Sequence, residues 1–280
     1  MKSRTLAFAL VLAVGLSAPA ETLKINGSTT VNPPVAEAAE ILRAERQLEI
    51  QVDTQGGSSG GISMLGDGTV QIGMSSKPLS DDDRARYPGV DFRETQIGED
   101  AVAMVVSRDV WEGGVRVLSR TQLRGIYEGR ITNWRDAGGA AQRIVFFNKE
   151  PGRGTWEVFV QWLYGSAKAA PQVSFPEVGG NEETRSKVGS TRGAISQLSA
   201  TWADGVRVWA LGIRLEDGSM VEPTSENIAT QRYPLSRPLY LLTRGAPVGA
   251  AATLVDFMVS ERGQELVKKH GYLRMKDLRK

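Results

Sequence analysis

The sequence LKINGSTTVNPP, residues 23–34, has the pattern of a strand, a hydroxyl-rich loop and the start of a helix. Pro33 and Pro34 suit a first helical turn, where a fixed φ and a missing N–H do little harm. The apolar residues that follow recur at helical spacing: Val35, Ala38, Ala39 and Leu42. This stretch therefore predicts a β–α unit with the loop Gly27-Ser28-Thr29-Thr30 at its joint.

The same arrangement is predicted twice more along the chain. GGSSGG at residues 56–61 follows a predicted strand at 48–52, and GRGT at residues 152–155 lies between a predicted strand at 143–147 and a predicted helix at 156–164. At such a joint the first N–H groups of the helix are unpaired, the helix dipole is positive, and glycine lets a ligand approach the main chain. Three such loops in one chain predict a site for a tetrahedral oxyanion.

Patterning along the chain predicts two α/β regions. The first eighty residues read as βαβαβ, a parallel sheet with crossover helices, in which ligands lie beyond the carboxyl ends of the strands. All six tryptophans fall between residues 100 and 236, which indicates a second domain with its own core, and Trp134 is expected in that core rather than at a ligand. A strand at 237–243 and one helix over about 249–269 complete the chain.

The N-terminus has the pattern of a cleavable export signal. Lys2 and Arg4 precede an apolar run over residues 6–16, and small residues lead to Ala20. We expect cleavage after Ala20 (signal peptide 1–20) and a periplasmic mature chain. No later segment reaches the roughly 18 apolar residues that a transmembrane helix needs. Because the sequence contains no cysteine, neither a disulfide nor a lipid anchor is expected.

Charge and composition argue against several classes of function. Without Lys2 and Arg4 the 34 basic residues become 32, equal to the 32 acidic ones, and this balance does not indicate a nucleic-acid partner. With no cysteine and a single histidine, His270, a zinc site or a Ser-His or Cys-His nucleophile lacks its components. We therefore expect a non-enzymatic protein without catalytic residues, metal or cofactor.

The motifs and their order closely resemble the periplasmic phosphate-binding proteins of ABC importers. The matching segments span nearly the whole mature chain and lie at residues 27–31, 55–60, 72–76, 126–134 and 233–238. The resemblance implies an α/β fold of the type II periplasmic binding protein class. In that fold each of two domains has a mostly parallel sheet flanked by helices, and the anion lies in the cleft between the domains.

The resemblance also implies domain boundaries and partners. It places domain one at residues 21–99 plus 237–280 and domain two at residues 100–236. The implied function is to bind inorganic phosphate in the periplasm and to deliver it to the membrane permease subunits of an ABC importer. We expect the protein to act as a monomer.

Phosphate ligands follow from the resemblance residue by residue. In the first loop they are Thr29 and the backbone N–H of Thr30, and in the second loop the ligand is Ser58. In the third loop they are Thr155 and the N–H of Gly154.

The third loop departs from the family pattern at two basic residues. Lys149 stands where the family has an arginine, and Arg153 stands where it has a serine. Lysine is a compact point charge, whereas arginine grips two oxygens through a planar fork. Both residues are candidate ligands, and Arg153 is expected to restore the fork that Lys149 lacks.

Four further residues complete the candidate site. Ser76 stands where one branch of the family has an aspartate that accepts the proton of phosphate, and a serine hydroxyl can accept as well as donate. Asp100 is a candidate replacement acceptor, with a strand-end or hinge role as the alternative. Ser28 and Ser59 are also candidates, although helix capping alone would explain both.

Other functions remain open on the sequence alone. A carrier for another oxyanion, such as sulfate or molybdate, or for a phosphorylated solute would use the same loops. A secreted phosphoesterase would use them to hold its product. A sensor or scavenger that serves no importer is a further alternative.

Overall fold

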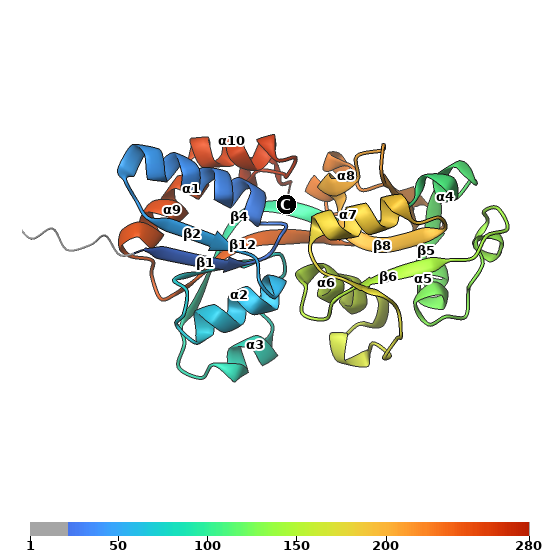
Figure 1. The fold of residues 1–280 in the computed structure, drawn as a ribbon, viewed down its shortest axis with the longest axis horizontal. Helices are drawn as coiled ribbons and strands as arrows, with labels where there is room; N and C mark the ends of the chain where they lie inside the picture. The colour runs from blue at the N-terminus through green and yellow to red at the C-terminus, as the bar shows by residue number, and fades with distance from the viewer. Residues whose placement is uncertain (1–21, 280) are drawn as a thin grey trace, which may run out of the picture.

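The computed structural model describes residues 22–279 and shows two α/β lobes side by side (Figure 1). Two long strands, β4 (Phe92–Val106) and β12 (Ser236–Arg244), run from one lobe into the other. Residues 92–101 of β4 pair with β12, whereas residues 102–106 pair with β8 (Ala194–Ser199). β4 therefore changes partner at the junction between the lobes.

The first lobe contains the predicted parallel βαβαβ segment. Its strands are β1 (Leu23–Gly27), β2 (Ile50–Asp53) and β3 (Ile72–Ser75), and its helices are α1 (Asn32–Arg46), α2 (Gly57–Gly66), α3 (Asp81–Arg86), α9 (Gly249–Val259) and α10 (Glu261–Lys269). β1 pairs in parallel with both β2 and β3, which confirms the prediction, and β12 lies antiparallel to β3. In Figure 1, α1, α9 and α10 lie on one side of this sheet, and α2 and α3 lie on the other.

The core of the first lobe follows from the amphipathic pattern of α1. Prolines occupy the first turn of this helix, as predicted. Its buried face packs with apolar residues of the strands and of the two C-terminal helices, and the α1 residues in this core are Val35, Ala38, Ala39 and Leu42. The hydrophobic effect thus fixes α1 across the sheet and leaves the β1–α1 loop at the edge that faces the second lobe.

The single helix expected over residues 249–269 is two helices. The backbone leaves the helical conformation at Ser260 (φ −67°, ψ 165°), whose hydroxyl accepts a hydrogen bond from the N–H of Gly263 at 3.4 Å. A Cβ at Gly263 would lie 2.1 Å from the carbonyl oxygen of Phe257, so glycine permits the tight turn. Leu254 and Val267 are buried in the same core on either side of the break. Hydrophobic periodicity therefore did not reveal it.

The second lobe extends the sheet in the order β4-β8-β6-β7 and adds a small sheet, β11-β10-β5. Its remaining strands are β5 (Val117–Ser119), β6 (Val145–Lys149), β7 (Glu177–Val178), β9 (Trp209–Ala210), β10 (Gly212–Arg214) and β11 (Met220–Val221). Its helices are α4 (Arg108–Glu112), α5 (Arg120–Tyr127), α6 (Gly154–Tyr164), α7 (Asn181–Ser190) and α8 (Ser225–Ala229). The short 3-10 helices of the two lobes are η1 (Trp134–Ala137), η2 (Ala167–Ala169), η3 (Ala200–Trp202) and η4 (Met275–Asp277).

Tryptophans pack in the cores of the second lobe. Trp134 is buried, as predicted, and its indole N–H donates a hydrogen bond to the carbonyl oxygen of Gly193 at 2.9 Å. The other five are partly buried and pack against the apolar clusters of this lobe: Trp111, Trp156, Trp162, Trp202 and Trp209.

The predicted signal peptide, residues 1–20, and its cleavage after Ala20 lie outside the described residues. Within residues 22–279, no helix has both the length and the apolar character that spanning a bilayer requires.

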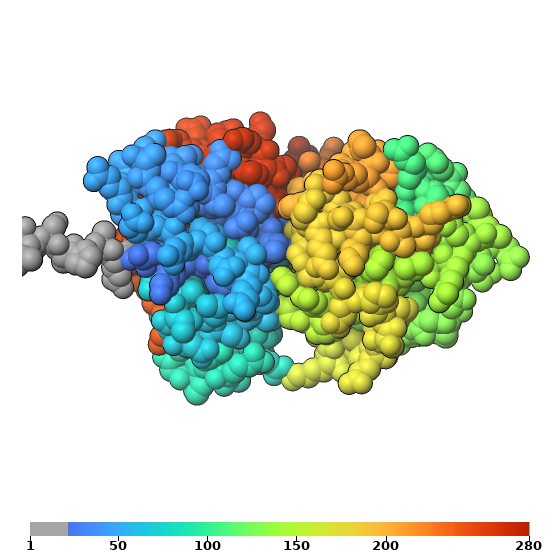
Figure 2. All heavy atoms as spheres, viewed as in Figure 1, coloured from blue at the N-terminus to red at the C-terminus, as the bar shows by residue number. Residues whose placement is uncertain are grey.

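The two lobes touch along a seam, which Figure 2 shows closed over most of its length. A gap remains at the lower edge of that view, between the surface of the first lobe and that of the second. The strand-to-helix loops of both lobes meet inside this seam, so the seam is where a site would lie.

Candidate functional site

Four strand-to-helix loops meet between the lobes. Three are the predicted loops, β1–α1, β2–α2 and β6–α6, and each does follow a strand and precede a helix. The fourth, VGGN at residues 178–181, joins β7 to α7 and was not predicted. With residue 76, which follows β3, they line one small cavity: Ser28, Thr29, Thr30, Gly57, Ser58, Ser76, Lys149, Arg153, Gly154, Thr155, Gly179 and Asn181. Every predicted candidate except Ser59 and Asp100 is in this set.

The first lobe lines its side of the cavity with neutral hydroxyl groups that bond to one another. The Ser28 hydroxyl donates to the Ser76 hydroxyl at 3.0 Å and accepts from the N–H of Thr30 at 3.2 Å. The Ser58 hydroxyl accepts from the N–H of Ser76 at 3.1 Å. These side chains are buried, so their orientation is set by the network rather than by water.

Glycine lets the N-terminus of α6 reach these hydroxyls. A Cβ at Gly154 would lie 2.6 Å from both the Ser58 and the Ser76 hydroxyl oxygens. At Gly57 the backbone has a φ of +59°, and a Cβ there would lie 2.6 Å from the side chain of Arg153. The first N–H groups of a helix have no partner within the helix, so α6 presents donors to the cavity.

Lys149 places a buried positive charge on the second-lobe side. Its ammonium donates to the carbonyl oxygens of Gly179 and Gly180 at 2.8 and 3.0 Å, and to the Asn181 side-chain oxygen at 3.4 Å. Among residues 22–279, no ion pair includes Lys149, in contrast to the buried cations Lys77 and Arg237. Burial, reinforced by the charges of Arg153 and Arg237, holds the pKa of Lys149 well below its usual value of 10.5.

We expected the Arg153 guanidinium to be available to a ligand in the cavity, but it is bound to a carboxylate of its own loop. Its Nε and one terminal nitrogen both donate to the same carboxylate oxygen of Glu150, at 2.9 and 2.6 Å. Arg153 still lines the cavity, but its charge is paired within its own loop. The two predicted basic residues thus differ, because Arg153 has a carboxylate partner and Lys149 does not.

Arg237, on β12, was not predicted as a site residue, yet it lies directly behind the cavity. Its side chain is buried, and it donates to the hydroxyls of Thr155 at 2.9 Å, Thr30 at 3.1 Å and Ser76 at 3.3 Å. Two further bonds, at 2.8 and 3.1 Å, go to one carboxylate oxygen of Asp100. Arg237 therefore connects hydroxyls of both lobes through one guanidinium.

Asp100, a candidate proton acceptor for which a strand-end or hinge role was the other interpretation, is the counterion of Arg237. The two residues face each other in register on β4 and β12, at the junction of the lobes. Burial raises the pKa of Asp100, and the guanidinium opposes that rise. Asp100 does not line the cavity, because Arg237 lies between it and the hydroxyls.

The sequence did contain signals for the residues that were missed. In β12, Arg237 alternates in phase with Leu239 and Leu241, which are buried, so the period of two indicated an inward-facing charge. Asn181 follows two glycines between a strand and a helix, the same pattern as the three predicted loops, and its amide donates to the Thr30 hydroxyl at 3.0 Å.

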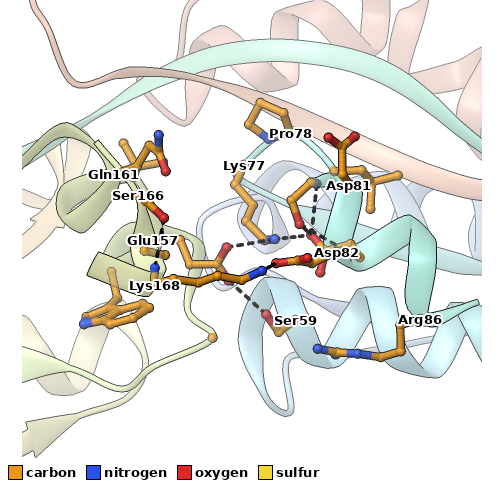
Figure 3. Close-up of a pocket in the computed structure, with 17 residues that line it drawn as sticks. Ser59, Lys77, Pro78, Asp81, Asp82, Arg86, Glu157, Gln161, Ser166 and Lys168 are labelled. Carbon is orange, nitrogen blue, oxygen red and sulfur yellow. Dashed lines mark hydrogen bonds and ion pairs between the residues drawn. The ribbon is translucent and has the colours of Figure 1, made fainter. Parts of the chain in front are cut away.

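Ser59, the other predicted residue outside the cavity, lines a larger open pocket next to it. This pocket, of about 890 Å³, lies between α3 and α6 (Figure 3). The Ser59 hydroxyl donates to the Glu157 carboxylate at 3.1 Å. The cause is the direction of the α2 first turn, in which successive side chains point different ways, so that Ser58 faces the cavity and Ser59 does not.

Ion pairs in the open pocket cross from lobe to lobe. Lys77 of the first lobe pairs with Glu157 of the second at 2.9 Å and with Asp83 of its own lobe (Figure 3). Burial lowers the pKa of Lys77, but the two carboxylates outweigh it, and the net shift is upward. Lys168 and Asp82 form a second, exposed pair across the seam at 2.6 Å. Four acidic residues (Asp81, Asp82, Asp83 and Glu157) and three basic ones (Lys77, Arg86 and Lys168) line this pocket, so its charge favours an anion less than that of the cavity, which no acidic residue among the described ones lines.

The single histidine of the sequence, His270, lies outside the cavity. His270 lies at the end of α10, as predicted, and its Nε2 is 2.9 Å from a carboxylate oxygen of Glu37. Within residues 22–279, no group of three or more His, Asp and Glu side chains is arranged to hold a metal ion.

Comparison with known proteins identifies the family. A family model described as a PBP superfamily domain matches residues 14–262. The phosphate-binding protein PstS of Bacillus subtilis (strain 168) is 30% identical over 263 residues, which cover 92% of this chain and 82% of that protein. The PstS of Borreliella burgdorferi is 27% identical over 91% of this chain and 90% of its own length.

Solved structures agree with these sequence matches. A Clostridium perfringens protein, assigned as a phosphate ABC transporter substrate-binding protein and solved with bound phosphate, superimposes with a TM-score of 0.80 at 28% identity, covering 91% of this chain and all of that one. An ABC-type phosphate transport receptor from Vibrio cholerae gives a TM-score of 0.71 at 27% identity, covering 90% and 99% of the two chains. The chain therefore has the type II periplasmic binding protein fold and belongs to the PstS family of phosphate-binding proteins within the PBP superfamily.

Proposed function

We propose that this protein binds inorganic phosphate in the cavity between its lobes and delivers it to the permease of an ABC importer. One observation carries the proposal: the cavity contains a buried lysine, Lys149, with no carboxylate partner among the described residues. A buried charge is costly unless it is paired. An anion in the cavity would supply the missing partner, and the family relationship indicates which anion.

The donors around the cavity suit a tetrahedral oxyanion. Hydroxyls of Thr29, Thr30, Ser58, Ser76 and Thr155 surround it, and the N–H groups at the start of α6, including that of Gly154, face the same space. Fixed hydroxyl and peptide dipoles replace the hydration shell of an ion, and hydrogen bonds to a charged acceptor are short and strong. We propose these residues, with Ser28, Lys149 and Arg153, as the phosphate site.

Contacts between the lobes support closure over the ligand. The N–H of Ser59 donates to the carbonyl oxygen of Gly152 at 3.1 Å, and Asn181 bonds to Thr30, so each lobe touches the other at the cavity wall. We propose domain boundaries at residues 21–99 plus 237–280 and 100–236, with β4 and β12 as the hinge strands. Ligand contacts made from both sides would favour the closed form, and release would follow when the lobes part.

Location and assembly complete the proposal. The mature protein would begin after Ala20, carry no lipid and act as a monomer in the periplasm or outside the cell. Its role is to bind and carry rather than to catalyse, as in the PstS family. Membrane permease subunits are the proposed partners, and no nucleic-acid partner or cofactor is proposed.

Titration calorimetry tests this function directly. Protein freed of bound anion would be titrated with phosphate, sulfate, molybdate and glycerol phosphate under one buffer condition. We expect one phosphate to bind per chain, more tightly than any of the others. Tighter binding of glycerol phosphate or molybdate than of phosphate would replace the proposed ligand, and native mass spectrometry of protein purified without added anion would identify what the cell supplies.

A further inference from the structure

We propose that Arg237 is a positioning residue of the anion site, which turns hydroxyl protons toward the cavity and thereby makes the site prefer the more fully ionised form of its ligand. The inference rests on the proposed function, since it specifies how that same cavity treats phosphate. It concerns a residue that touches the hydroxyls rather than the cavity itself.

Asp100 holds the guanidinium of Arg237 in place on the side away from the cavity. Both its Nε and one terminal nitrogen bond to Asp100, and the side chains of the two residues are at most 1% exposed. The Asp100 carboxylate offsets part of the charge of the guanidinium. The guanidinium also presents a rigid set of N–H donors aimed at the hydroxyls of Thr30, Ser76 and Thr155.

The bonds from Arg237 occupy lone pairs of the hydroxyl oxygens and so limit what these hydroxyls can accept from a ligand. A hydroxyl has one proton to donate and two lone pairs to accept with. The Thr30 oxygen accepts from Arg237 and Asn181, and the Ser76 oxygen accepts from Arg237 and Ser28. Both oxygens have used their lone pairs, so each can only donate its proton. The Ser76 proton is directed to the Ser58 hydroxyl at 3.4 Å, and because the Ser58 oxygen also accepts from the N–H of Ser76, Ser58 in turn is left to donate. The Thr155 oxygen accepts once from Arg237 and keeps one lone pair.

The cavity lining among the described residues therefore offers a ligand proton neutral acceptors, such as the hydroxyls of Thr29 and Thr155, but no charged one. Among the described residues, no carboxylate lines the cavity, since Asp100 is screened by Arg237 and Glu150 is paired with Arg153. The carbonyl oxygen of Gly180 already accepts from Lys149 and Thr184, and that of Gly179 accepts once, from Lys149. Each proton on the ligand would displace a donor contact without finding a charged acceptor, which disfavours the doubly protonated monoanion of phosphate.

Two consequences distinguish such a site from one with a carboxylate acceptor. The affinity for phosphate should rise with pH through the second ionisation of phosphate. Sulfate, which carries no proton at these pH values, should not be strongly rejected. A site built to accept a ligand proton rejects an analogue that lacks it by about 10⁴-fold or more, whereas here we expect sulfate to bind within about 100-fold of phosphate.

Calorimetry of the wild-type protein with phosphate and with sulfate, at several pH values on either side of the second ionisation of phosphate, tests the proposal without any variant. We expect the phosphate dissociation constant to increase by up to about tenfold per pH unit on the acid side, and the sulfate constant to stay level over the same range. Phosphate binding that is independent of pH, together with no detectable sulfate binding, would overturn the proposal.

The variant Arg237→Lys tests the role of the guanidinium. Lysine keeps the charge beside Asp100 but lacks the planar fork that reaches several hydroxyls at once. We expect phosphate affinity to fall about 10- to 100-fold and its pH dependence to flatten, because freed hydroxyls can accept ligand protons. Arg244→Lys, at the exposed end of the same strand, is the control and should change neither. An affinity loss that leaves the wild-type pH dependence intact would reduce Arg237 to a purely structural role.

A second variant serves if Arg237→Lys does not fold, as judged by its thermal melting. Thr30→Val removes one of the oriented hydroxyls with little change of shape, and it should also weaken phosphate binding and flatten the pH dependence. A failure of this proposal can be distinguished from a failure of the proposed function. Binding of sulfate without any binding of phosphate would refute phosphate as the ligand but would agree with the donor-rich site proposed here. Phosphate binding that does not depend on pH would support phosphate as the ligand and refute the role proposed for Arg237.

Discussion

The two sides of the cavity differ in charge. The first lobe contributes neutral groups only, from the β1–α1 loop, the start of α2 and residue 76. The second lobe contributes the basic residues Lys149 and Arg153, together with the N-terminus of α6. Arg237 lies behind both and is paired with Asp100. The lobe that provides most of the hydroxyls is thus not the lobe that provides the charge.

This difference assigns separate tasks to the two lobes. Neutral donors fix the orientation of a bound oxyanion, and their loss removes one hydrogen bond at a time. A buried cation sets the sign of the ligand's charge, and its loss affects every orientation. An anion held by the first lobe would draw Lys149 toward it, so electrostatic attraction would act in the direction of closure.

Lys149→Met should have the largest effect on binding. Methionine has a similar length but no charge, so a bound anion would lose the one buried cation that has no carboxylate partner among the described residues. We expect phosphate affinity to fall by about 3 kcal/mol, roughly 100-fold, as measured by calorimetry. Lys187→Met, at an exposed position of α7, is the matched control and should bind normally. If the two variants bind alike, the charge of the second lobe is not what holds the ligand.

High pH should produce a related loss in the wild-type protein. The pKa of Lys149 is held below 10.5 by burial, and a lysine is neutral above its pKa. As the pH rises toward the range where exposed lysines titrate, the charge of Lys149 is therefore lost first, and phosphate affinity should fall. A calorimetric series on the alkaline side should show this fall in the wild-type protein and a much smaller one in Lys149→Met. Equal falls in both proteins would contradict the assignment.

Removal of a single hydroxyl should weaken phosphate binding less than Lys149→Met does, and by a similar amount in either lobe. Thr155→Ala in the second lobe and Ser58→Ala in the first each remove one donor from a buried cavity, and each should weaken phosphate binding by about 1 to 3 kcal/mol. Trp134→Phe serves as the control, because its indole bonds within the core, so this change should lower the melting temperature and leave binding unchanged. Normal phosphate binding by Thr155→Ala would show that the third loop does not contact the ligand.

The smallest effect is expected from the ion pairs outside the cavity. Glu157→Gln breaks the contact with Lys77 across the seam, but Asp83 still neutralises that lysine. We expect binding to weaken by about 1 kcal/mol or less, through the closed form alone. Lys168→Ala removes an exposed pair and should have no measurable effect. A loss from Glu157→Gln as large as that from Thr155→Ala would mean that the open pocket, not only the cavity, contributes to binding.

Local patterns in the sequence predicted most of the fold and the first-lobe side of the site. The βαβαβ order follows from alternating and helical apolar spacing, and glycine-hydroxyl loops at strand ends have a defined position in a parallel sheet. The break at Ser260 was not predictable from periodicity, because the apolar pattern continues through it.

The parts of the site that escaped prediction depend on contacts between distant residues. Arg237 and Asp100 are 137 positions apart, and only the pairing of β4 with β12 brings them together. Likewise, the sequence shows that Arg153 is basic but not that Glu150 holds its fork. Which cations are paired, and which one is left for a ligand, is a property of the tertiary structure.

A crystal structure of the protein with phosphate tests the central claim most directly. We predict one phosphate in the cavity between the lobes, with oxygens within hydrogen-bond distance of the Ser58 hydroxyl on one side and of the Thr155 hydroxyl and Gly154 N–H on the other, next to Lys149. Phosphate bound instead in the open pocket beside Lys77, or held by only one lobe, would contradict the account.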